Sequence, residues 1–138
     1  MDGEERKQQM SNAKIVENIY NSFLSRDIAA VMNSISDDCD WNAIGAPLVP
    51  YGGKFHGKEA IGFFQKIAET ISIENFTPNR IEEIKNGEVI AFGNMQAKAN
   101  NTGKSFTTPW FMHWKLNNGK VVYFHNYFDT AAAVSSIS

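Results

Sequence analysis

The sequence predicts an α+β fold, in which helices from the first half of the chain pack on a curved, mainly antiparallel sheet. Two observations lead to this prediction. Apolar residues recur at helical spacing in the first half, whereas from Glu74 onward the pattern is that of strands. Turn sequences interrupt the strand region at Asn86-Gly87, Asn101-Thr102-Gly103 and Asn118-Gly119. Helices followed by a run of strands are typical of α+β domains.

The helices are predicted at 12–25, 28–35 and 58–72. In the first helix, two rows with a spacing of four residues form one wide apolar face: Ile15/Ile19/Phe23 and Val16/Tyr20/Leu24. Asp27 can cap the second helix. A strand at 39–44 and a loop rich in glycine and proline at 45–53 separate the second helix from the third.

Four strands are predicted to form an antiparallel meander, at 75–85, 88–99, 105–116 and 120–129. The last two form a hairpin around Asn118-Gly119, the dipeptide that best tolerates the positive φ angles of a tight turn. Alternation places the side chains of the final strand on two faces: Phe124, Asn126 and Phe128 on one, and Tyr123, His125, Tyr127 and Asp129 on the other. A hairpin so rich in aromatic residues can form the wall of a pocket that holds little water.

Length and composition limit the classes of protein. The 138 residues suffice for one core, and we expect a mobile segment at 1–11 and a single domain at 12–138. A net charge of −2 without a basic stripe argues against nucleic-acid binding. No apolar run reaches the roughly 20 residues of a membrane span, and the N-terminus lacks a signal-like apolar region, so we expect a cytoplasmic protein without membrane contact. The lone Cys39 has no partner for an internal disulfide.

Three segments carry a resemblance to a known family: Ile15-Val16-Glu17-Asn18-Ile19-Tyr20 with Arg26-Asp27, Phe55-His56-Gly57-Lys58-Glu59-Ala60-Ile61 with Phe63-Phe64, and Asn118-Gly119-Lys120-Val121-Val122 with Tyr127-Phe128-Asp129-Thr130. In order and spacing they resemble the nuclear-transport-factor-like superfamily, and within it the SnoaL-like polyketide cyclases and ketosteroid-isomerase-related proteins. The resemblance covers Ile15 to Ala132. It implies a cystatin-like cone whose sheet and first helices enclose an apolar cavity, commonly with a homodimer formed through the sheet.

The catalytic groups of ketosteroid isomerases have no counterparts at the matching positions. The family's aspartate base falls at about Ala43, and its tyrosine falls on Ile19. Tyr20 is one residue away, which is about 100° around the helix. The acid position falls on Phe111 or Met112, depending on the length of the hairpin. Steroid isomerisation by the usual groups is therefore disfavoured.

Asn126 is the candidate catalytic residue. The SnoaL-type cyclases and related epoxide hydrolases place a carboxylate about seven residues after the hairpin glycine, and the resemblance puts Asn126 at that position. An asparagine amide donates and accepts hydrogen bonds but takes up no proton near neutral pH. Asn126 either orients a carbonyl or hydroxyl of a ligand or is a structural asparagine, and the sequence leaves both readings open.

Large apolar side chains are the candidates for ligand contact. Trp110, Met112 and Trp114 share one face of their strand, and Trp41 lies on the first strand. Most large aromatic residues belong to the core, but in a hollow domain some of them line the cavity. The ligand-binding candidates are Tyr20, Trp41, Trp110, Met112, Trp114, Phe124 and Phe128.

The remaining polar residues have simpler explanations. Asp129 can cap a short terminal helix, with a ligand contact as the alternative. His113 and His125 are expected to be cross-strand neighbours. They lack a third ligand at a metal-binding spacing, so we expect neither a metal nor another cofactor. His56 precedes Gly57 at a turn, and we expect it in a loop or on the surface.

Two functions remain. The first is binding of a small hydrophobic molecule, with an isomerase, cyclase or dehydratase-like reaction without the usual aspartate as an option. The second is a non-catalytic dimeric module whose exposed sheet face carries Phe111, His113, Tyr123 and His125. An open cavity with polar groups favours the first function, and a cavity filled by tryptophans favours the second.

Overall fold

The computed structural model describes residues 10–138. The segment that we expected to be mobile, 1–11, lies outside the described residues except for Met10 and Ser11. Within the described part, no helix has the length and apolar character needed to cross a membrane.

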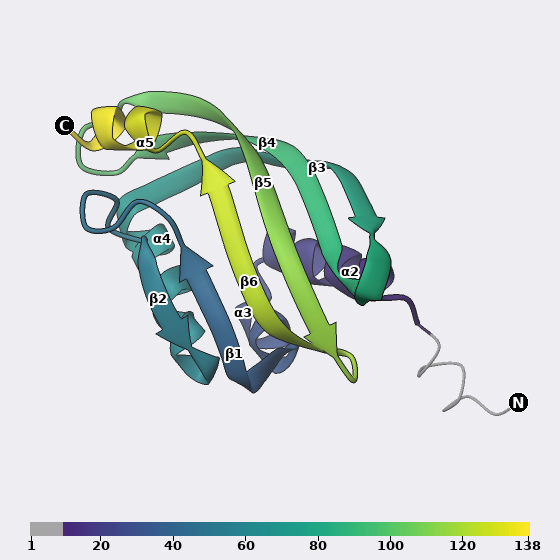
Figure 1. Cartoon of the computed structure of the whole chain (residues 1–138). Coiled ribbons are helices and arrows are strands. Elements are labelled where there is room, and N and C mark those ends of the chain that lie inside the picture. Colours follow the sequence, from purple (N-terminus) through teal and green to yellow (C-terminus); the bar gives the residue numbers. More distant parts are fainter. Residues whose placement is uncertain (1–9) are drawn as a thin grey trace, which may run out of the picture.

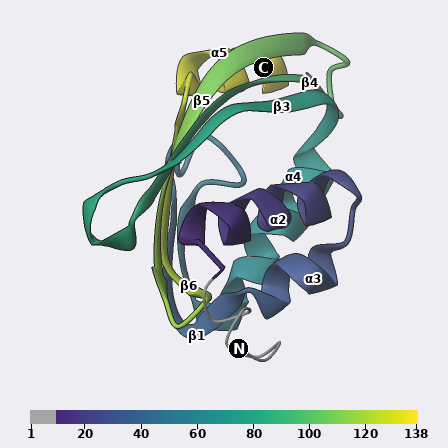
Figure 2. The same cartoon turned by 90° about the vertical axis from the view of Figure 1, so that its right-hand side faces the viewer.

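Helices cover one face of a six-stranded sheet (Figures 1 and 2). The helices are α2 (Asn12–Leu24), α3 (Ile28–Asn33), α4 (Ile61–Thr70) and α5 (Thr130–Ile137). The strands are β1 (Ile35–Ala43), β2 (Gly53–His56), β3 (Ile71–Glu83), β4 (Val89–Ala99), β5 (Ser105–Asn117) and β6 (Lys120–Phe128). Their order is β2-β1-β6-β5-β4-β3, and only the β1–β6 pair is parallel. Figure 2 shows α2, α3 and α4 together on the concave side of the sheet, while α5 packs against β4 and β5. The predicted α+β class is confirmed.

Side-chain caps define where two helices begin. Asp27 accepts a hydrogen bond from Ala30 N (3.1 Å) at the start of α3. Asp129 accepts one from Ala132 N (3.0 Å) at the start of α5. Each cap satisfies a backbone N–H that has no partner within its helix. The capping roles predicted for both aspartates are confirmed.

The structure contains one strand that the sequence did not predict. β2 lies where we expected a loop and a turn, and it pairs antiparallel with β1, with Trp41 opposite Phe55. β1 itself begins at Ile35 instead of Cys39. The second helix ends early because Ile35 pairs with Val121 of β6, which holds this part of the chain in the sheet.

The third helix is also shorter than predicted. A 3₁₀ turn at Gly57–Ala60 precedes α4, so the α-helix starts at Ile61 and ends at Thr70. Gly57 has a φ of 55°, and an added Cβ there would overlap the backbone of Asp37. The chain therefore turns tightly against β1 at a position that only glycine fills without strain.

The β5–β6 hairpin has the predicted turn. Asn118 (φ 51°) and Gly119 (φ 78°) both have positive φ angles, as a two-residue type I′ turn requires. The register places His113 opposite His125. The predicted pairing of the two histidines is confirmed.

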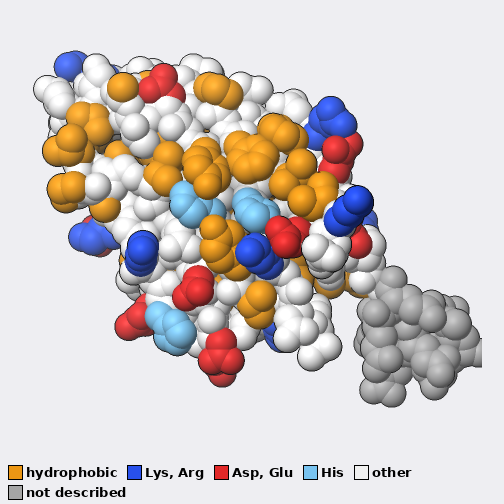
Figure 3. All heavy atoms as spheres, in the orientation of Figure 1, with side chains coloured by type: hydrophobic (Ala, Val, Ile, Leu, Met, Phe, Trp, Pro, Cys, Tyr) orange, Lys and Arg blue, Asp and Glu red, His pale blue; other side chains and the backbone are white. Residues whose placement is uncertain are grey.

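The convex face of the sheet, which α2, α3 and α4 leave uncovered, carries a row of ring side chains. We call it the outer aromatic strip, and its members are Phe92, Phe111, His113, Tyr123, His125 and Tyr127. Their rings contact one another in the order Phe92, Phe111, Tyr127, His125, Tyr123 and His113. His125 stacks on Tyr127 with centroids 4.4 Å apart. Figure 3 shows this band of apolar and histidine side chains bordered by charged groups. Phe92 and Tyr127 remain 39% and 45% exposed.

Candidate ligand-binding site

An apolar pocket lies between the helices and the concave face of the sheet. Its lining comes from α2, α3, α4, every strand except β2, and the loop before β2. The pocket volume is about 80 Å³, whereas an engineered cavity that admits benzene has about 150 Å³. A ring-sized ligand therefore enters only if wall side chains move. Met95 and Met112 are the unbranched, flexible side chains on the wall that can adapt in this way.

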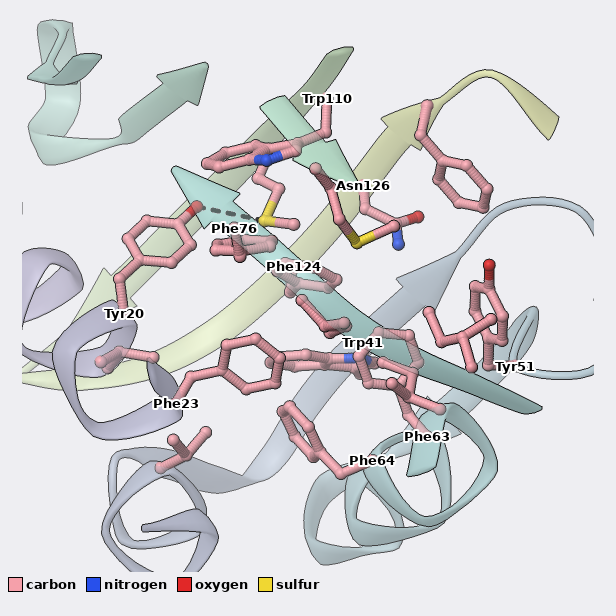
Figure 4. A pocket seen from close by; sticks show the side chains of 18 of the residues that line it. Tyr20, Phe23, Trp41, Tyr51, Phe63, Phe64, Phe76, Trp110, Phe124 and Asn126 are labelled. Carbon is pink, nitrogen blue, oxygen red and sulfur yellow. Dashed lines mark hydrogen bonds between the residues drawn. The ribbon is translucent and has the colours of Figure 1, made fainter. Parts of the chain in front are cut away.

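Stacked aromatic rings form two walls of the pocket. Trp41 of β1 stacks on Phe124 of β6, with ring centroids 3.8 Å apart and planes at 16°. Phe76 of β3 stacks on Trp110 of β5 at 4.8 Å and 11°. Figure 4 shows these two pairs around the pocket. Flat walls of this kind favour a flat apolar molecule, because aromatic faces provide a large contact area.

Tyr20 connects α2 to β5 inside the pocket. Its hydroxyl accepts a hydrogen bond from Trp114 Nε1 (3.1 Å) and donates one to Met112 Sδ (3.1 Å; Figure 4). Burial raises the pKa of Tyr20 far above its ordinary value of 10, so the hydroxyl stays protonated at neutral pH. Because its donor and its acceptor are both used within the protein, Tyr20 is a fixed part of the wall.

Three other polar groups of the wall have no hydrogen-bond partner among residues 10–138. They are the indole Nε1 of Trp41, the indole Nε1 of Trp110 and the hydroxyl of Tyr51. The three residues are only 2%, 5% and 5% exposed, respectively. Burial raises the pKa of Tyr51 to about 12, so its hydroxyl is also a donor at neutral pH. A buried polar group left without a partner typically costs about 1–3 kcal/mol, which makes three in one pocket noteworthy.

Asn126 of β6 lies on the pocket wall with one end of its amide engaged. Its Oδ1 accepts a hydrogen bond from Ile44 N (2.9 Å), just after β1. Because the backbone N–H only donates, this contact identifies the oxygen end of the amide. Within residues 10–138, Asn126 Nδ2 donates no hydrogen bond. In Figure 4, the Asn126 amide points to the side of the pocket on which Tyr51 lies. Asn126 thus combines a structural bond with an available donor.

No Asp, Glu, His, Lys, Arg or Cys side chain lines this pocket within residues 10–138. Its polar side chains are tyrosine, tryptophan, threonine and asparagine, none of which takes up a proton near neutral pH. The pocket can therefore orient and polarise a carbonyl group through hydrogen bonds, but it supplies no general base of its own.

All the residues predicted for the site line this one pocket: Tyr20, Trp41, Trp110, Met112, Trp114, Phe124, Asn126 and Phe128. Of the two residues that could match the isomerase acid position, Met112 lines the pocket, whereas Phe111 belongs to the outer aromatic strip. The prediction missed Tyr51, although an aromatic residue in a loop rich in glycine and proline was a usable signal. It also missed Phe63 and Phe64 as pocket residues, although both belong to the segments that carry the family resemblance.

The histidines lie away from the pocket. His56 and His125 line a separate polar depression on β1, β2 and β6, together with Asp40, Lys54 and Glu59. His113 forms a short hydrogen bond with Glu88 (2.6 Å). Within the described residues, no three His, Cys, Asp or Glu side chains are grouped so that they could hold a metal ion.

Solved structures share this fold. An NTF2-like protein of unknown function from Burkholderia pseudomallei K96243 is 28% identical with a TM-score of 0.84, over 94% of this chain and 99% of that one. TerC, co-crystallised with polyporic acid, is 22% identical with a TM-score of 0.80, over 91% and 97%. A Pseudomonas putida KT2440 protein provisionally assigned as a polyketide cyclase is 16% identical with a TM-score of 0.75, over 94% and 99%. The architecture is therefore that of the NTF2-like proteins.

The family follows from the sequence itself. A family model described as a SnoaL-like domain matches residues 16–124, which is most of the chain. The protein belongs to the SnoaL-like domain family. No curated protein matches the chain.

Proposed function

We propose that the protein binds a small hydrophobic molecule in the pocket between α2, α4 and the sheet. The observation that carries this proposal is a wall of stacked aromatic rings that contains buried hydrogen-bond donors without a protein partner. A packed core normally satisfies its polar groups, whereas a ligand site keeps a few convergent polar groups for the ligand. The co-crystallisation of TerC with polyporic acid and the cyclase assignment of the Pseudomonas protein support a small-molecule ligand for this fold.

We propose ligand binding without proton transfer by a side chain of the pocket. The resemblance puts a carboxylate at the position of Asn126, and among residues 10–138 the pocket lining has no group that accepts a proton near neutral pH. If an isomerase, cyclase or dehydratase-like reaction takes place here, Asn126 contributes by donating from Nδ2 to a carbonyl. A base must then come from the substrate or from water.

Ligand titration tests the proposal. Steroids, polycyclic ketones and polyporic acid are added to the purified protein while tryptophan fluorescence is followed. All three tryptophans line the pocket, so we expect a saturable change for at least one compound. The variant Ile73→Phe fills the pocket and should abolish the response, because Ile73 is on the wall. The matched control is Ile84→Phe, an exposed isoleucine outside the pocket.

Two results would contradict binding in this pocket. One is the absence of a saturable change with wild-type protein across the panel. The other is a response that Ile73→Phe leaves intact, because the ligand would then bind elsewhere.

Self-association is the second candidate function. We propose that two copies pair through the outer aromatic strip, a surface on which Phe92 and Tyr127 expose much of their rings. Contiguous exposed apolar patches typically mark protein interaction sites. The strip and the pocket lie on opposite faces of the same strands, so a homodimer leaves the pocket free.

A further inference from the structure

Each polar group of the pocket that has no partner among residues 10–138 carries a hydrogen-bond donor. The indole nitrogens of Trp41 and Trp110 only donate, and the Tyr51 hydroxyl, which can donate and accept, stays protonated at neutral pH and so keeps its donor. Asn126 also presents its Nδ2 as a donor, since Oδ1 already accepts from Ile44 N. A ligand that completes this site has to bring acceptors.

These donors are distributed around the pocket. In Figure 4, the indole nitrogens of Trp110 and Trp41 lie on different sides, and the Tyr51 hydroxyl lies on the side of the Asn126 amide. Each of the three unpartnered groups is on a side chain that is at least nine-tenths buried. Their burial means that bulk water does not replace the missing partner.

The lining also indicates the charge of the ligand. No cationic side chain of the described residues lines the pocket, so a carboxylate or phosphate would enter without a counter-charge. Burying an unpaired ion costs several kcal/mol even after relaxation. No Asp or Glu side chain of residues 10–138 lines the pocket either, which disfavours a cation for the same reason.

Resting on the proposed function, we infer that the ligand is an uncharged, flat ring compound whose polar groups are hydrogen-bond acceptors, such as ketone oxygens, bound by Trp41, Trp110 and Tyr51. The stacked walls select the flat ring, and the donors select the oxygen. A hydrocarbon of the same shape satisfies only the first condition.

A matched pair of probes tests the inference, namely 1-tetralone and tetralin, which differ by one carbonyl oxygen. Their binding is followed through the indole N–H signals of ¹⁵N-labelled protein. Trp114 is a built-in control, because its Nε1 already donates to Tyr20. The variants Trp41→Phe and Trp110→Phe assign the signals.

We expect 1-tetralone to move the Trp41 signal, the Trp110 signal or both to lower field while the Trp114 signal moves little. We expect tetralin to bind roughly fivefold more weakly, the equivalent of one net hydrogen bond, without this shift.

Substitution of one donor provides a second measurement. Tyr51→Phe removes a hydroxyl and nothing else, and Tyr127→Phe makes the same change on the outer aromatic strip. We expect Tyr51→Phe to weaken 1-tetralone severalfold and to leave tetralin unchanged, and Tyr127→Phe to change neither affinity.

The outcomes separate the inference from the proposed function. If both probes bind with equal affinity and no indole signal moves to lower field, the donors do not bind the carbonyl oxygen. This result overturns the inference and leaves the proposed binding in the pocket intact. If neither probe binds up to its solubility limit while another compound of the panel does, the inference is overturned and the proposed function stands.

Discussion

At the scale of single residues, substitutions can separate the structural bond of Asn126 from the ligand-binding role that we propose for it. Asn126→Ala removes the acceptor of Ile44 N, and leaving this backbone donor without a partner should lower the free energy of unfolding by about 1–3 kcal/mol. Asn126→Asp keeps an oxygen at this position but replaces the amide donor by a carboxyl group. Urea unfolding of the two variants measures the structural role, and ligand titration measures the other.

The pH dependence of Asn126→Asp tests how dry the pocket is. Burial among aromatic rings raises the pKa of the new carboxyl in the folded state above its unfolded value of about 3.9. Because this pKa is raised in the folded state, the free energy of unfolding is highest below about pH 4 and decreases as the pH rises through the folded-state pKa. Relative to wild type, the variant should therefore be less stable at pH 8 than at pH 4. An equal stability difference at both pH values would show that the group is well solvated.

Cys39 should be unreactive in the native protein. Its side chain is fully buried in β1, and burial, assisted by the nearby charge of Asp40, raises its pKa from 9.0 to about 12. Since the thiolate is the reactive form, a disulfide reagent such as DTNB should react at pH 8 only at the rate at which the protein unfolds. In urea the thiol should react at once. Fast reaction of one thiol in native protein would contradict this prediction.

Gly93 makes room for one wall of the pocket. An added Cβ on β4 would overlap the Trp110 ring and the Thr77 carbonyl oxygen. Gly93→Ala should thus displace Trp110 and destabilise the protein by about 1–3 kcal/mol, with a changed near-ultraviolet circular dichroism of tryptophan. The control is Gly62→Ala in α4, where the new Cβ makes ordinary contacts with Phe55. There, alanine should stabilise by up to about 1 kcal/mol. An undisturbed tryptophan signal in Gly93→Ala would contradict this packing.

At the scale of elements, substitutions of Asp129 distinguish a helix-capping role from a ligand-binding role. It caps α5 through Ala132 N and does not line the pocket. Asp129→Ala should cost about 1 kcal/mol of stability, and Asp129→Asn, which keeps a capping oxygen, should cost little. Neither variant should change ligand affinity, measured by the fluorescence titration. A large loss of affinity in both variants would favour the alternative that Asp129 contacts the ligand.

Elements also show what the sequence could predict. The β5–β6 hairpin was predictable because Asn118-Gly119 sets the turn and strict alternation sets the faces, which placed Asn126 toward the pocket. β2 was not predictable, because four residues after a loop rich in glycine and proline are too few to establish a strand pattern, and they are held as an edge strand by pairing with β1. Tyr51 reaches the pocket through a loop whose path depends on tertiary contacts. The pocket volume depends on how side chains interlock, which no local pattern encodes.

At the scale of the whole molecule, the pocket and the outer aromatic strip share strands. Along β5, Trp110 and Met112 face the pocket, whereas Phe111 and His113 belong to the strip. Association through the strip would cover the exposed rings and leave the lining of the pocket unchanged. Ligand binding and self-association can therefore be measured independently.

Replacement of one ring of the strip should separate the two copies. Wild-type protein should sediment in analytical ultracentrifugation at twice the chain mass of 15.4 kDa. Phe92→Lys replaces an exposed ring of the strip by a charge that dimerisation would bury without a partner, so this variant should sediment as a monomer. Leu48→Lys is the matched control, because Leu48 is 68% exposed but lies in the loop before β2; it should leave the dimer intact. Both variants should retain ligand affinity, since neither residue lines the pocket. Wild-type protein that sediments as a monomer at every concentration would show that the strip does not pair two copies, and its exposed rings would then need another partner.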